Sequence, residues 1–257
     1  MTASELFDIA GKRAVVTGGG SGIGTMIASG LVEAGVSVII ASRKEDSLKE
    51  VTETLAERGD CSYIVADLST EGGCERLGAA VAERWDALDI LVNNAGANWG
   101  APLAEQNSAS WHRVLDVNVE GVFHTTKFLL PLLQAAGRED EPARIINIGS
   151  IDGIQVPGFE TYAYSASKAA VHQLTRHLAK HLAPQITVNA IAPGPFQSRM
   201  MKATLAAAGD GIAKMVPLRR IGQPQDMAGP AIFLCSKAGA YLTGAIIPVD
   251  GGIATTK

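Results

Sequence analysis

Seven short runs rich in β-branched residues alternate with longer segments of helical periodicity, and this alternation restricts the folds open to the chain. Several runs are apolar nearly throughout, which is typical of strands covered by helices on both faces of a parallel sheet. The intervening segments carry apolar residues three to four positions apart, as amphipathic helices do. Strands are predicted at residues 13–17, 37–41, 62–66, 90–93, 144–148, 186–191 and 245–249, and helices at 22–35, 45–58 and 163–182. The sequence therefore predicts an α/β fold, a doubly wound seven-stranded parallel sheet with helices on both faces.

The length of 257 residues suits one large α/β unit better than two small domains. No composition break, low-complexity tract or linker divides the chain, so residues 1–257 are predicted to form a single domain. The one irregular region, 193–217, follows the sixth predicted strand. Doubly wound sheets bind ligands beyond the carboxyl ends of their strands, so we expect this region to cover the site as a substrate lid.

Charge and cysteine content argue against several classes of partner. A formal net charge of −4, with both signs scattered along the chain, gives no basic stripe for a nucleic-acid backbone. Cys61, Cys74 and Cys235 are too few and too widely spaced for a disulfide framework, and none belongs to a metal-type CxxC pair. We therefore expect no nucleic-acid partner, no metal and a reducing, cytoplasmic compartment.

We expect neither an export signal nor a membrane span. Residues 1–12 carry Glu5 and Asp8 before any basic residue and lack an apolar core segment. The most apolar stretch, 122–133, is interrupted by polar residues and by Pro131, and it is shorter than the ~20 apolar residues of a span. It is predicted to be a buried helix.

A glycine-rich turn, Thr17 to Gly24, connects the first predicted strand to a helix. Glycines there allow positive φ and close approach to a pyrophosphate, while the helix N-terminus offers free N–H groups and a positive dipole. An ordinary tight turn is the alternative, but the position after the first strand favours a cofactor site.

Two further groups of residues follow predicted strands. Asn93 to Gly96 comes after the fourth strand, where small residues let the backbone pass beside a ligand; an ordinary Asx turn is equally compatible with it. Tyr164 and Lys168 lie four residues apart and share one helix face, and Ser150 follows the fifth strand. A neighbouring ammonium favours the phenolate, so we expect Lys168 to bring the pKa of Tyr164 closer to neutrality. A solvated helix face is the alternative for this pair.

These three groups together resemble the short-chain dehydrogenase/reductase family over essentially the whole chain. The glycine turn is similar to its TGxxxGxG motif, Asn93 to Gly96 to its NNAG and Tyr164 to Lys168 to its YxxxK. The resemblance implies a Rossmann fold, a nicotinamide cofactor and a homotetramer or homodimer. Within the family, the chain is most similar to bacterial 3-oxoacyl (β-ketoacyl) reductases.

The resemblance also assigns roles to individual residues. It implies a catalytic tetrad of Asn118, Ser150, Tyr164 and Lys168, in which Asn118 bends its helix and holds a proton-relaying water. Ser198 stands where the family's PGxxxT motif has threonine, and its hydroxyl is expected to keep the nicotinamide contact. The expected cofactor-binding residues are Gly18, Gly20, Ser21, Gly22, Ile23, Gly24, Arg43, Lys44, Asp67, Leu68, Asn94, Ala95, Gly96, Tyr164, Lys168, Pro193, Gly194 and Ser198.

The end of the second predicted strand bears on cofactor choice. A carboxylate there pairs with the free ribose hydroxyls of NAD, whereas an arginine accepts the 2′-phosphate of NADP. The chain has Ser42 at the acidic position, then Arg43 and Lys44. We expect NADP(H) to be preferred over NAD(H), with Arg43 the main ligand; two exposed helix-start residues without a ligand are the alternative.

Large apolar residues gather in the segments expected to edge the site, namely Trp99, Phe159, Phe196, Met200, Met201, Leu205 and Met215. They suit an apolar acyl substrate, or they anchor the lid to the core. His177 and His181, four residues apart, are predicted to lie on a solvated or interfacial helix because no third metal ligand accompanies them, and His112, His124 and His172 are expected to be structural. Cys61 and Cys235 are expected in the core.

The prediction is an NADPH-dependent oxidoreductase that reduces a 3-oxoacyl-type or similar apolar ketone to a secondary alcohol, with Tyr164 as general acid. An NAD-linked secondary-alcohol or sugar-alcohol dehydrogenase is the alternative enzyme. A dinucleotide-binding regulator is the alternative outside catalysis, although such a protein has no need for Ser150, Tyr164 and Lys168 together.

Overall fold

A single seven-stranded parallel sheet organises the computed structural model, which describes residues 1–198, 209 and 211–256. The strand order is β3-β2-β1-β4-β5-β6-β7, and every neighbouring pair is parallel. The strands are β1 (Arg13–Thr17), β2 (Ser37–Ser42), β3 (Cys61–Val65), β4 (Ile90–Asn93), β5 (Ala143–Ile148), β6 (Ile186–Pro193) and β7 (Ile246–Val249). All seven predicted strands are confirmed, with ends that differ by at most two residues.

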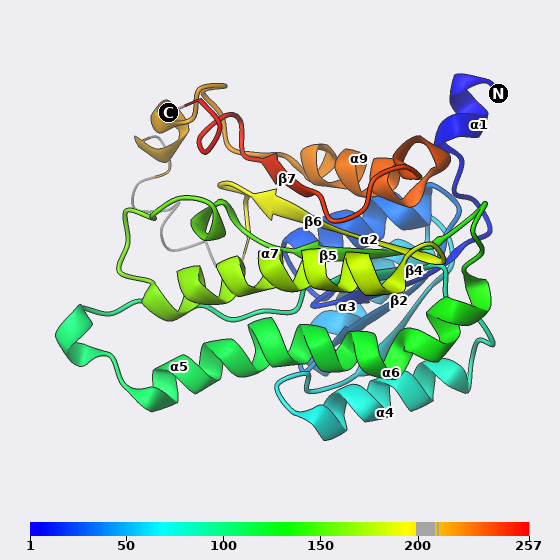
Figure 1. The fold of residues 1–257 in the computed structure, drawn as a ribbon, viewed down its shortest axis with the longest axis horizontal. Coiled ribbons are helices and arrows are strands. Elements are labelled where there is room, and N and C mark those ends of the chain that lie inside the picture. The colour runs from blue at the N-terminus through cyan, green and yellow to red at the C-terminus, as the bar shows by residue number, and fades with distance from the viewer. Residues whose placement is uncertain (199–208, 210, 257) are drawn as a thin grey trace.

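Helices cover both faces of this sheet (Figure 1). One layer holds α2 (Ile23–Glu33), α3 (Glu45–Ala56) and α9 (Pro224–Cys235). The other holds α4 (Glu71–Ala82), α6 (Gly121–Ala136) and α7 (Tyr162–Leu182), with α5 (Ser108–Leu115) packed against α7. The short elements are α1 (Ala3–Phe7), a π-helical turn η2 (Asp116–Glu120) and three 3₁₀ turns, η1 (Leu103–Glu105), η3 (Ile151–Gly153) and η4 (Lys237–Gly239). The predicted doubly wound architecture is therefore confirmed.

The two helical layers enclose separate cores because successive strand residues point to opposite faces. In β1, Val16 packs with the cluster that contains α2, α3 and α9, whereas Val15 packs with the cluster that contains α4, α6 and α7. Both valines are fully buried. Burial on both faces explains why the strand reads as a continuous apolar run rather than an alternating one.

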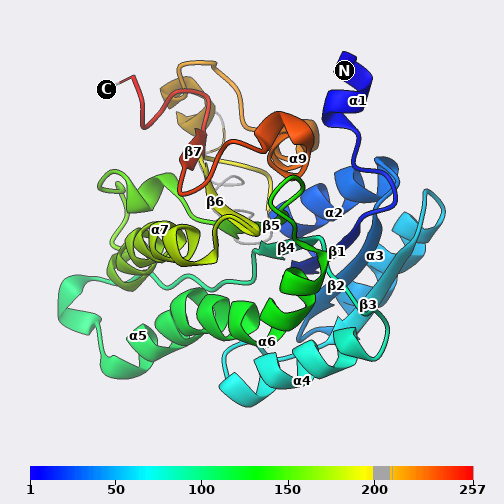
Figure 2. The same ribbon diagram turned by 45° about the vertical axis from the view of Figure 1, so that its right-hand side comes forward.

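The strand order reverses between β1 and β4, as the view in Figure 2 shows. From β1 the chain moves outward through β2 to β3, then returns to place β4 on the other side of β1. The loops that leave these strands at their carboxyl ends diverge at this point, which creates the crevice where doubly wound sheets bind ligands. Glycine-rich and asparagine-rich turns follow β1 and β4 respectively.

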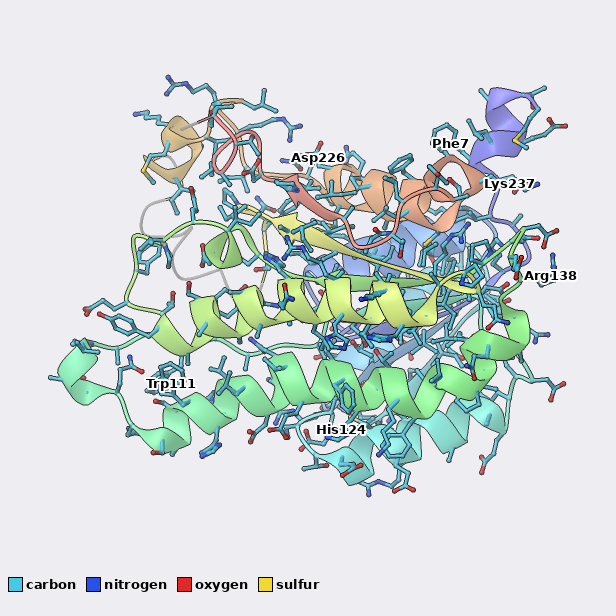
Figure 3. The ribbon with its side chains drawn as sticks, in the orientation of Figure 1. Phe7, Trp111, His124, Arg138, Asp226 and Lys237 are labelled. Atoms are coloured by element: carbon cyan, nitrogen blue, oxygen red, sulfur yellow. The ribbon has the colours of Figure 1, made fainter. Side chains whose placement is uncertain are left out.

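Helix α6 corrects one expectation, since only one of its faces is buried. Leu129 and Leu133 are fully buried, but Phe123 is 45% exposed. His124 lies on the side that faces α4, with Nδ1 3.6 Å from Glu71 Oε1 (Figure 3). The predicted buried helix is thus amphipathic, because it packs on the sheet and α4 while its remaining surface meets solvent.

The irregular region predicted at 193–217 is described only in part, since residues 199–208 and 210 lie outside the described structure. Met200, Met201 and Leu205 fall in that segment. Within the described chain, none of the helices combines the length and apolarity that crossing a membrane requires. Cys61, Cys74 and Cys235 are buried thiols, so the prediction that Cys61 and Cys235 belong to the core is confirmed.

Candidate active site

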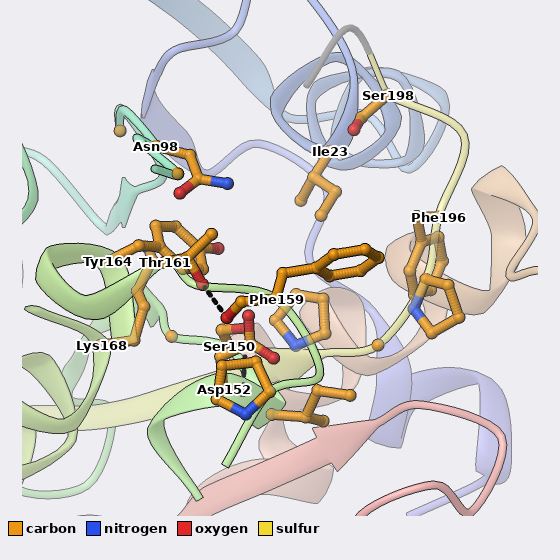
Figure 4. Close-up of a pocket in the computed structure, with 18 of the residues that line it drawn as sticks. Ile23, Asn98, Ser150, Asp152, Phe159, Thr161, Tyr164, Lys168, Phe196 and Ser198 are labelled. Carbon is orange, nitrogen blue, oxygen red and sulfur yellow. Dashed lines mark hydrogen bonds between the residues drawn. The ribbon is translucent and has the colours of Figure 1, made fainter. Parts of the chain in front are cut away.

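A cavity of about 970 Å³ lies at the carboxyl edge of the sheet. The loops after β1, β4, β5 and β6 all contribute to its wall, together with the start of α7. Figure 4 shows Ser150, Tyr164 and Lys168 to one side of this cavity, with Ile23 and Ser198 across from them. The cavity therefore brings residues from the three predicted motifs to one place.

The glycine turn has the geometry of a cradle for an anion. Gly18 and Gly22 adopt φ of 66° and 59°, a conformation that L side chains rarely take. A Cβ on Gly24 would lie 2.4 Å from the carbonyl oxygen of Gly18, so the helix passes this backbone at a distance only glycine allows. Helix α2 begins at Ile23 with no side-chain cap, which leaves its first N–H groups available. This turn fits the pyrophosphate of a dinucleotide.

Asn94 supports the glycine turn from the neighbouring strand. Its Nδ2 donates to the carbonyl of Thr17 at 2.8 Å, and its backbone N–H and that of Ala95 donate to Thr17 Oγ1 at 2.9 and 3.0 Å. The asparagine therefore bonds the glycine turn on the neighbouring strand and not its own loop, while Asn94, Ala95 and Gly96 line the cavity. The described hydrogen bonds favour the ligand-side interpretation of this motif over an ordinary Asx turn.

Ser150, Tyr164 and Lys168 converge on the cavity wall. The hydroxyls of Ser150 and Tyr164 share a hydrogen bond, drawn as a dashed line in Figure 4. Lys168 Nζ donates to the carbonyl of Ile148 at 2.7 Å and lies 5.5 Å from the centre of the Tyr164 ring. Lys168 is 5% exposed, so the alternative of a solvated helix face is wrong. A phenol and an ammonium inside one cavity provide a proton donor and a positive charge beside it.

The pKa values correct the expected influence of Lys168 on Tyr164. Burial raises the pKa of Tyr164 to about 12, with the negative charge of Asp152 adding to this and the hydrogen bond from Ser150 opposing it. Burial also lowers the pKa of Lys168 to about 8, against the charge of Asp152. Lys168 does not lower the tyrosine pKa as expected, because an amine with a pKa of about 8 is neutral before Tyr164 titrates near 12. At neutral pH Tyr164 is a phenol, the form that donates a proton.

Asn118 lies in the π-helical turn between α5 and α6, so the expected irregularity in its helix is present. Its Oδ1 accepts from the N–H of Ala97 at 2.8 Å, and its Nδ2 donates to the Ala97 carbonyl at 3.0 Å. A third hydrogen bond, 2.9 Å long, reaches Ser167 Oγ on α7. Asn118 therefore ties the loop after β4 to the helix that carries Tyr164 and Lys168.

The loop after β6 forms the part of the cavity wall that contains the predicted nicotinamide contacts. Pro193 pairs with Val249 in β7, and the N–H of Gly194 donates to the Val249 carbonyl at 3.0 Å. A Cβ on Gly194 would lie 2.7 Å from Cα of Asp250, which explains glycine at this position. Pro193, Gly194 and Ser198 line the cavity as expected.

Six expected cofactor residues lie outside the cavity wall. Gly20 and Gly24 belong to the glycine turn, and the other four lie at the carboxyl ends of β2 and β3: Arg43, Lys44, Asp67 and Leu68. Arg43 is exposed, and its Nε lies 3.9 Å from Asp67 Oδ1. A Cβ on Gly20 would come within 3.4 Å of Ser42 Oγ, so the end of β2 lies directly beside the glycine turn. The side chain of Leu68 is buried in the core, which leaves its backbone for any contact with an adenine. These residues extend the site along the sheet edge.

The apolar wall differs in part from the prediction. Phe159, Phe196 and Met215 line the cavity, but Trp99 does not: its ring lies under the guanidinium of Arg113, 5.4 Å from the centroid. Sequence reasoning missed several lining residues, namely Asn98, Ile151, Asp152, Gln155, Val156, Thr161 and Ile212. Apart from Ile212, which lies in a helical turn, they come from loops and a short 3₁₀ turn without periodicity, so only their nearness to the three motifs could have indicated them.

The histidines take no part in this cavity. His172 is buried beneath the loop that carries Ser150, and burial lowers its pKa to about 4. The rings of His177 and His181 stack with centroids 4.8 Å apart on α7. Among the described residues, no group of three or more histidine, cysteine or acidic side chains could hold a metal ion.

Comparisons with known proteins find oxidoreductases that match nearly the whole length of the chain. The family model described as enoyl-(acyl carrier protein) reductase matches residues 18–254. The rhamnolipids biosynthesis 3-oxoacyl-[acyl-carrier-protein] reductase of Pseudomonas aeruginosa is 48% identical over 96% of this chain and 97% of its own. The solved Pseudomonas aeruginosa RhlG/NADP complex superposes with a TM-score of 0.94 at 47% identity, covering 97% of this chain and 99% of that one.

Relatives of lower identity act on different substrates. Galactitol 2-dehydrogenase of Rhizobium johnstonii is 36% identical over 98% of both chains. A gluconate 5-dehydrogenase from Burkholderia cenocepacia, solved with NADP and tartrate, has a TM-score of 0.91 at 33% identity over the full length of both chains.

Proposed function

The chain belongs to the short-chain dehydrogenase/reductase family of oxidoreductases, and from this premise we propose that it reduces an apolar, 3-oxoacyl-type ketone with NADPH. The observation that carries the proposal is the convergence of Ser150, Tyr164 and Lys168 in the cavity that the glycine turn borders. A regulator that only binds dinucleotides has no need of this convergence.

The proposed mechanism assigns one task to each side chain. Bound NADPH would supply the hydride for the carbonyl carbon. Ser150 Oγ holds the carbonyl oxygen by a hydrogen bond, which fixes the ketone in a reactive position. Tyr164 Oη, protonated at neutral pH, donates its proton to that oxygen as the alcohol forms. Lys168 places a positive charge beside the phenol, and Asn118 holds the helix that carries both.

We propose NADP(H) as the preferred cofactor, held by the eighteen residues predicted from the sequence. Arg43 and Lys44 follow β2, where the adenosine ribose of a dinucleotide lies, and no carboxylate occupies the position of Ser42. The exposed guanidinium of Arg43 is able to turn toward a 2′-phosphate. RhlG and the Burkholderia gluconate 5-dehydrogenase, both structural relatives, were solved with NADP.

An apolar acyl chain is the substrate that the cavity wall favours. Ile151, Val156 and Phe159 come from the segment after β5, and the described parts of residues 193–217 supply Phe196 and Met215. This supports the role of 193–217 as a lid over the substrate in a single domain. The 3-oxoacyl reductase from Pseudomonas is the relative whose substrate matches such a wall.

A sugar-alcohol or sugar-acid dehydrogenase is the second candidate, and the relatives that act on galactitol and gluconate favour it. Sugar substrates need several hydrogen-bond partners, and Asn98, Gln155 and Thr161 offer some in this wall, but most of the accessible wall surface is apolar. We further propose a cytoplasmic homotetramer or homodimer, and three buried, unpaired thiols are consistent with a reducing compartment.

The experiment is a substrate panel with purified protein. 3-Oxoacyl thioesters of increasing chain length, small polar ketones and galactitol or gluconate are each assayed with NADPH or NADP⁺ and with NADH or NAD⁺. The proposal expects the highest kcat/KM for apolar 3-oxoacyl compounds with NADPH. A kcat/KM that falls steadily as the acyl chain lengthens, or a preference for the polyol with NAD⁺, would contradict it.

A further inference from the structure

Asp152 places a carboxylate in the wall of the cavity, close to the reacting groups. It belongs to the 3₁₀ turn η3 (Ile151–Gly153), which follows β5 directly. Ser150 caps this turn, since its Oγ accepts the N–H of Asp152 at 3.1 Å. Figure 4 shows the Asp152 carboxylate beside Ser150, on the side of the cavity where Tyr164 lies. Ser150 and Asp152 are therefore fixed relative to one another.

The carboxylate oxygens of Asp152 accept no hydrogen bond from any described residue of the chain. Its backbone carbonyl accepts from Ser165 Oγ at 2.6 Å, but none of the described residues donates a hydrogen bond to its Oδ atoms. Its charge acts on both Tyr164 and Lys168 through space, without a direct ion pair to either among the described residues. A ligand that enters this part of the cavity is therefore placed beside a negatively charged group.

Within the described part of the lining, one positive charge is present to offset this field, and it leaves the lining with a net negative charge. Among the described lining residues, the acids are Asp152 and Glu160 and the one basic side chain is Lys168. Lys168 is engaged with the Ile148 carbonyl and lies over the Tyr164 ring. In a partly dehydrated cavity, like charges repel more strongly than they do in water.

We propose that Asp152 is a specificity-determining residue: it excludes ketones with a carboxylate close to the reacting carbonyl and so selects neutral esters and thioesters of 3-oxo acids. The inference rests on the proposed function, because it assumes that a ketone is reduced beside Ser150 and Tyr164. A free 3-oxo acid carries its carboxylate two carbons from the ketone. Its thioester presents an uncharged carbonyl at the same place, which leaves the acyl chain free to use the apolar wall.

The test compares a matched pair of substrates, the 3-oxohexanoate anion and its ethyl ester, with NADPH at pH 7.5. The ratio of kcat/KM for the ester to that for the acid is measured in the wild-type protein and in Asp152→Asn. We expect this ratio to fall at least tenfold in the variant, mainly because the acid becomes a better substrate. The amide keeps the size of the side chain, and near-ultraviolet circular dichroism with NADPH titration verifies that the variant folds.

Glu160→Gln is the matched control, since it also removes one carboxylate from the lining. Glu160 Oε1 already accepts hydrogen bonds from the Leu103 N–H and the Tyr162 hydroxyl, at 3.3 and 2.9 Å. We expect its ester-to-acid ratio to stay within threefold of the wild-type value. An equal shift in both variants would assign the discrimination to overall charge and overturn the role of Asp152.

A measurement on the wild-type protein is independent of any variant. Hexanoate and hexanamide are compared as inhibitors of ester reduction, and we expect the neutral amide to have an inhibition constant at least tenfold lower. Equal inhibition, or an unchanged ester-to-acid ratio in Asp152→Asn, overturns the inference while leaving ketone reduction intact. If neither the acid nor the ester is reduced, the proposed function itself fails, and this inference with it.

Discussion

Asn118 Nδ2 donates a hydrogen bond of 2.9 Å to Ser167 Oγ and so connects the π-helical turn η2 to the catalytic helix α7. Ser167 lies between Tyr164 and Lys168 in the chain, and its hydroxyl donates to the Tyr164 carbonyl at 2.7 Å. The same asparagine holds both polar groups of Ala97 in the loop after β4. One buried side chain therefore couples two walls of the cavity.

Asn118→Ala should cost more stability than Ser167→Ala. The first change leaves the N–H and carbonyl of Ala97 without their partner. The second removes the hydrogen bond from Asn118 Nδ2 and a local one to the Tyr164 carbonyl, and it leaves both contacts of Asn118 with Ala97 in place. We expect losses of about 2 to 4 kcal/mol and about 1 kcal/mol respectively in the free energy of unfolding. Urea denaturation of both variants measures this difference, and equal losses would refute the coupling.

Tyr164→Phe should keep the fold and NADPH binding but lose turnover by several orders of magnitude, because the proton for the carbonyl oxygen has no other donor. A pKa of about 12 keeps the phenol protonated from pH 6 to 9, so loss of the Tyr164 proton should not limit wild-type reduction in that range. Steady-state kinetics at saturating ketone tests the substitution. A variant that retained more than ~10% of wild-type kcat, a loss below ~1.4 kcal/mol, would exclude Tyr164 as the donor.

The buried ammonium of Lys168 should make stability depend on pH. Its folded pKa of about 8 lies below the unfolded value of 10.5, so between these pH values the unfolded chain binds more protons than the folded one. Stability contributed by this group therefore rises as pH increases from about 8 to 10.5, by up to about 3 kcal/mol. Lys168→Met lacks this contribution.

The comparison of the two proteins isolates that effect. The free energies of unfolding of both proteins are measured at several pH values from 7 to 10.5. At each pH the wild-type value is subtracted from the Lys168→Met value. We expect this difference to shrink with rising pH. A difference that stays constant would mean that Lys168 titrates with its ordinary pKa in the folded protein.

The strands were predictable because burial on both faces imposes continuous apolar runs, and the turns after β1 and β4 because they need glycine and small residues. Gly24 illustrates this, since its position against the Gly18 carbonyl admits no Cβ. The convergence of Ser150, Tyr164 and Lys168 was predictable because Ser150 follows a strand and the other two residues are spaced by one helical turn. The expected bend at Asn118 came from family resemblance, not from any periodicity of its own.

The remaining features depend on orientations that spacing does not encode. Trp99 lies between Asn98 and Gly100, which both line the cavity, yet its own ring packs under Arg113. Asp152 stands in a short 3₁₀ turn with no repeating pattern, and its direction is fixed by the cap that Ser150 provides. The pKa of Tyr164 depends on burial, which a four-residue spacing to Lys168 does not reveal.

Gly24→Ala and Gly20→Ala should differ sharply although both lie in the glycine turn. A Cβ at Gly24 would lie 2.4 Å from the Gly18 carbonyl oxygen and 2.5 Å from Asn94 Nδ2, so the backbone must shift. At Gly20 the nearest atoms are side-chain atoms at 3.4 Å, an ordinary contact. We expect Gly24→Ala to lower the melting temperature by several degrees and to abolish NADPH binding, while Gly20→Ala keeps the melting temperature within about 2 °C. Differential scanning fluorimetry with and without NADPH makes the comparison, and matching losses would refute the close approach at Gly24.

Arg43→Ala should weaken NADPH binding and leave NADH binding nearly unchanged. The guanidinium is 67% exposed and its nearest acid, Asp67, is 3.9 Å away, so little holds it back from a 2′-phosphate. A charge-assisted, bidentate contact of roughly 1.5 to 3 kcal/mol corresponds to about ten- to a hundredfold in Kd. Lys44→Ala should have a smaller effect, because an ammonium binds phosphate as a point charge without the planar fork of arginine. Titration of both cofactors by fluorescence gives the two Kd values for each protein. Equal Kd values for NADH and NADPH in the wild-type protein would show that the end of β2 does not recognise the 2′-phosphate. Equal weakening of both cofactors in Arg43→Ala would show the same.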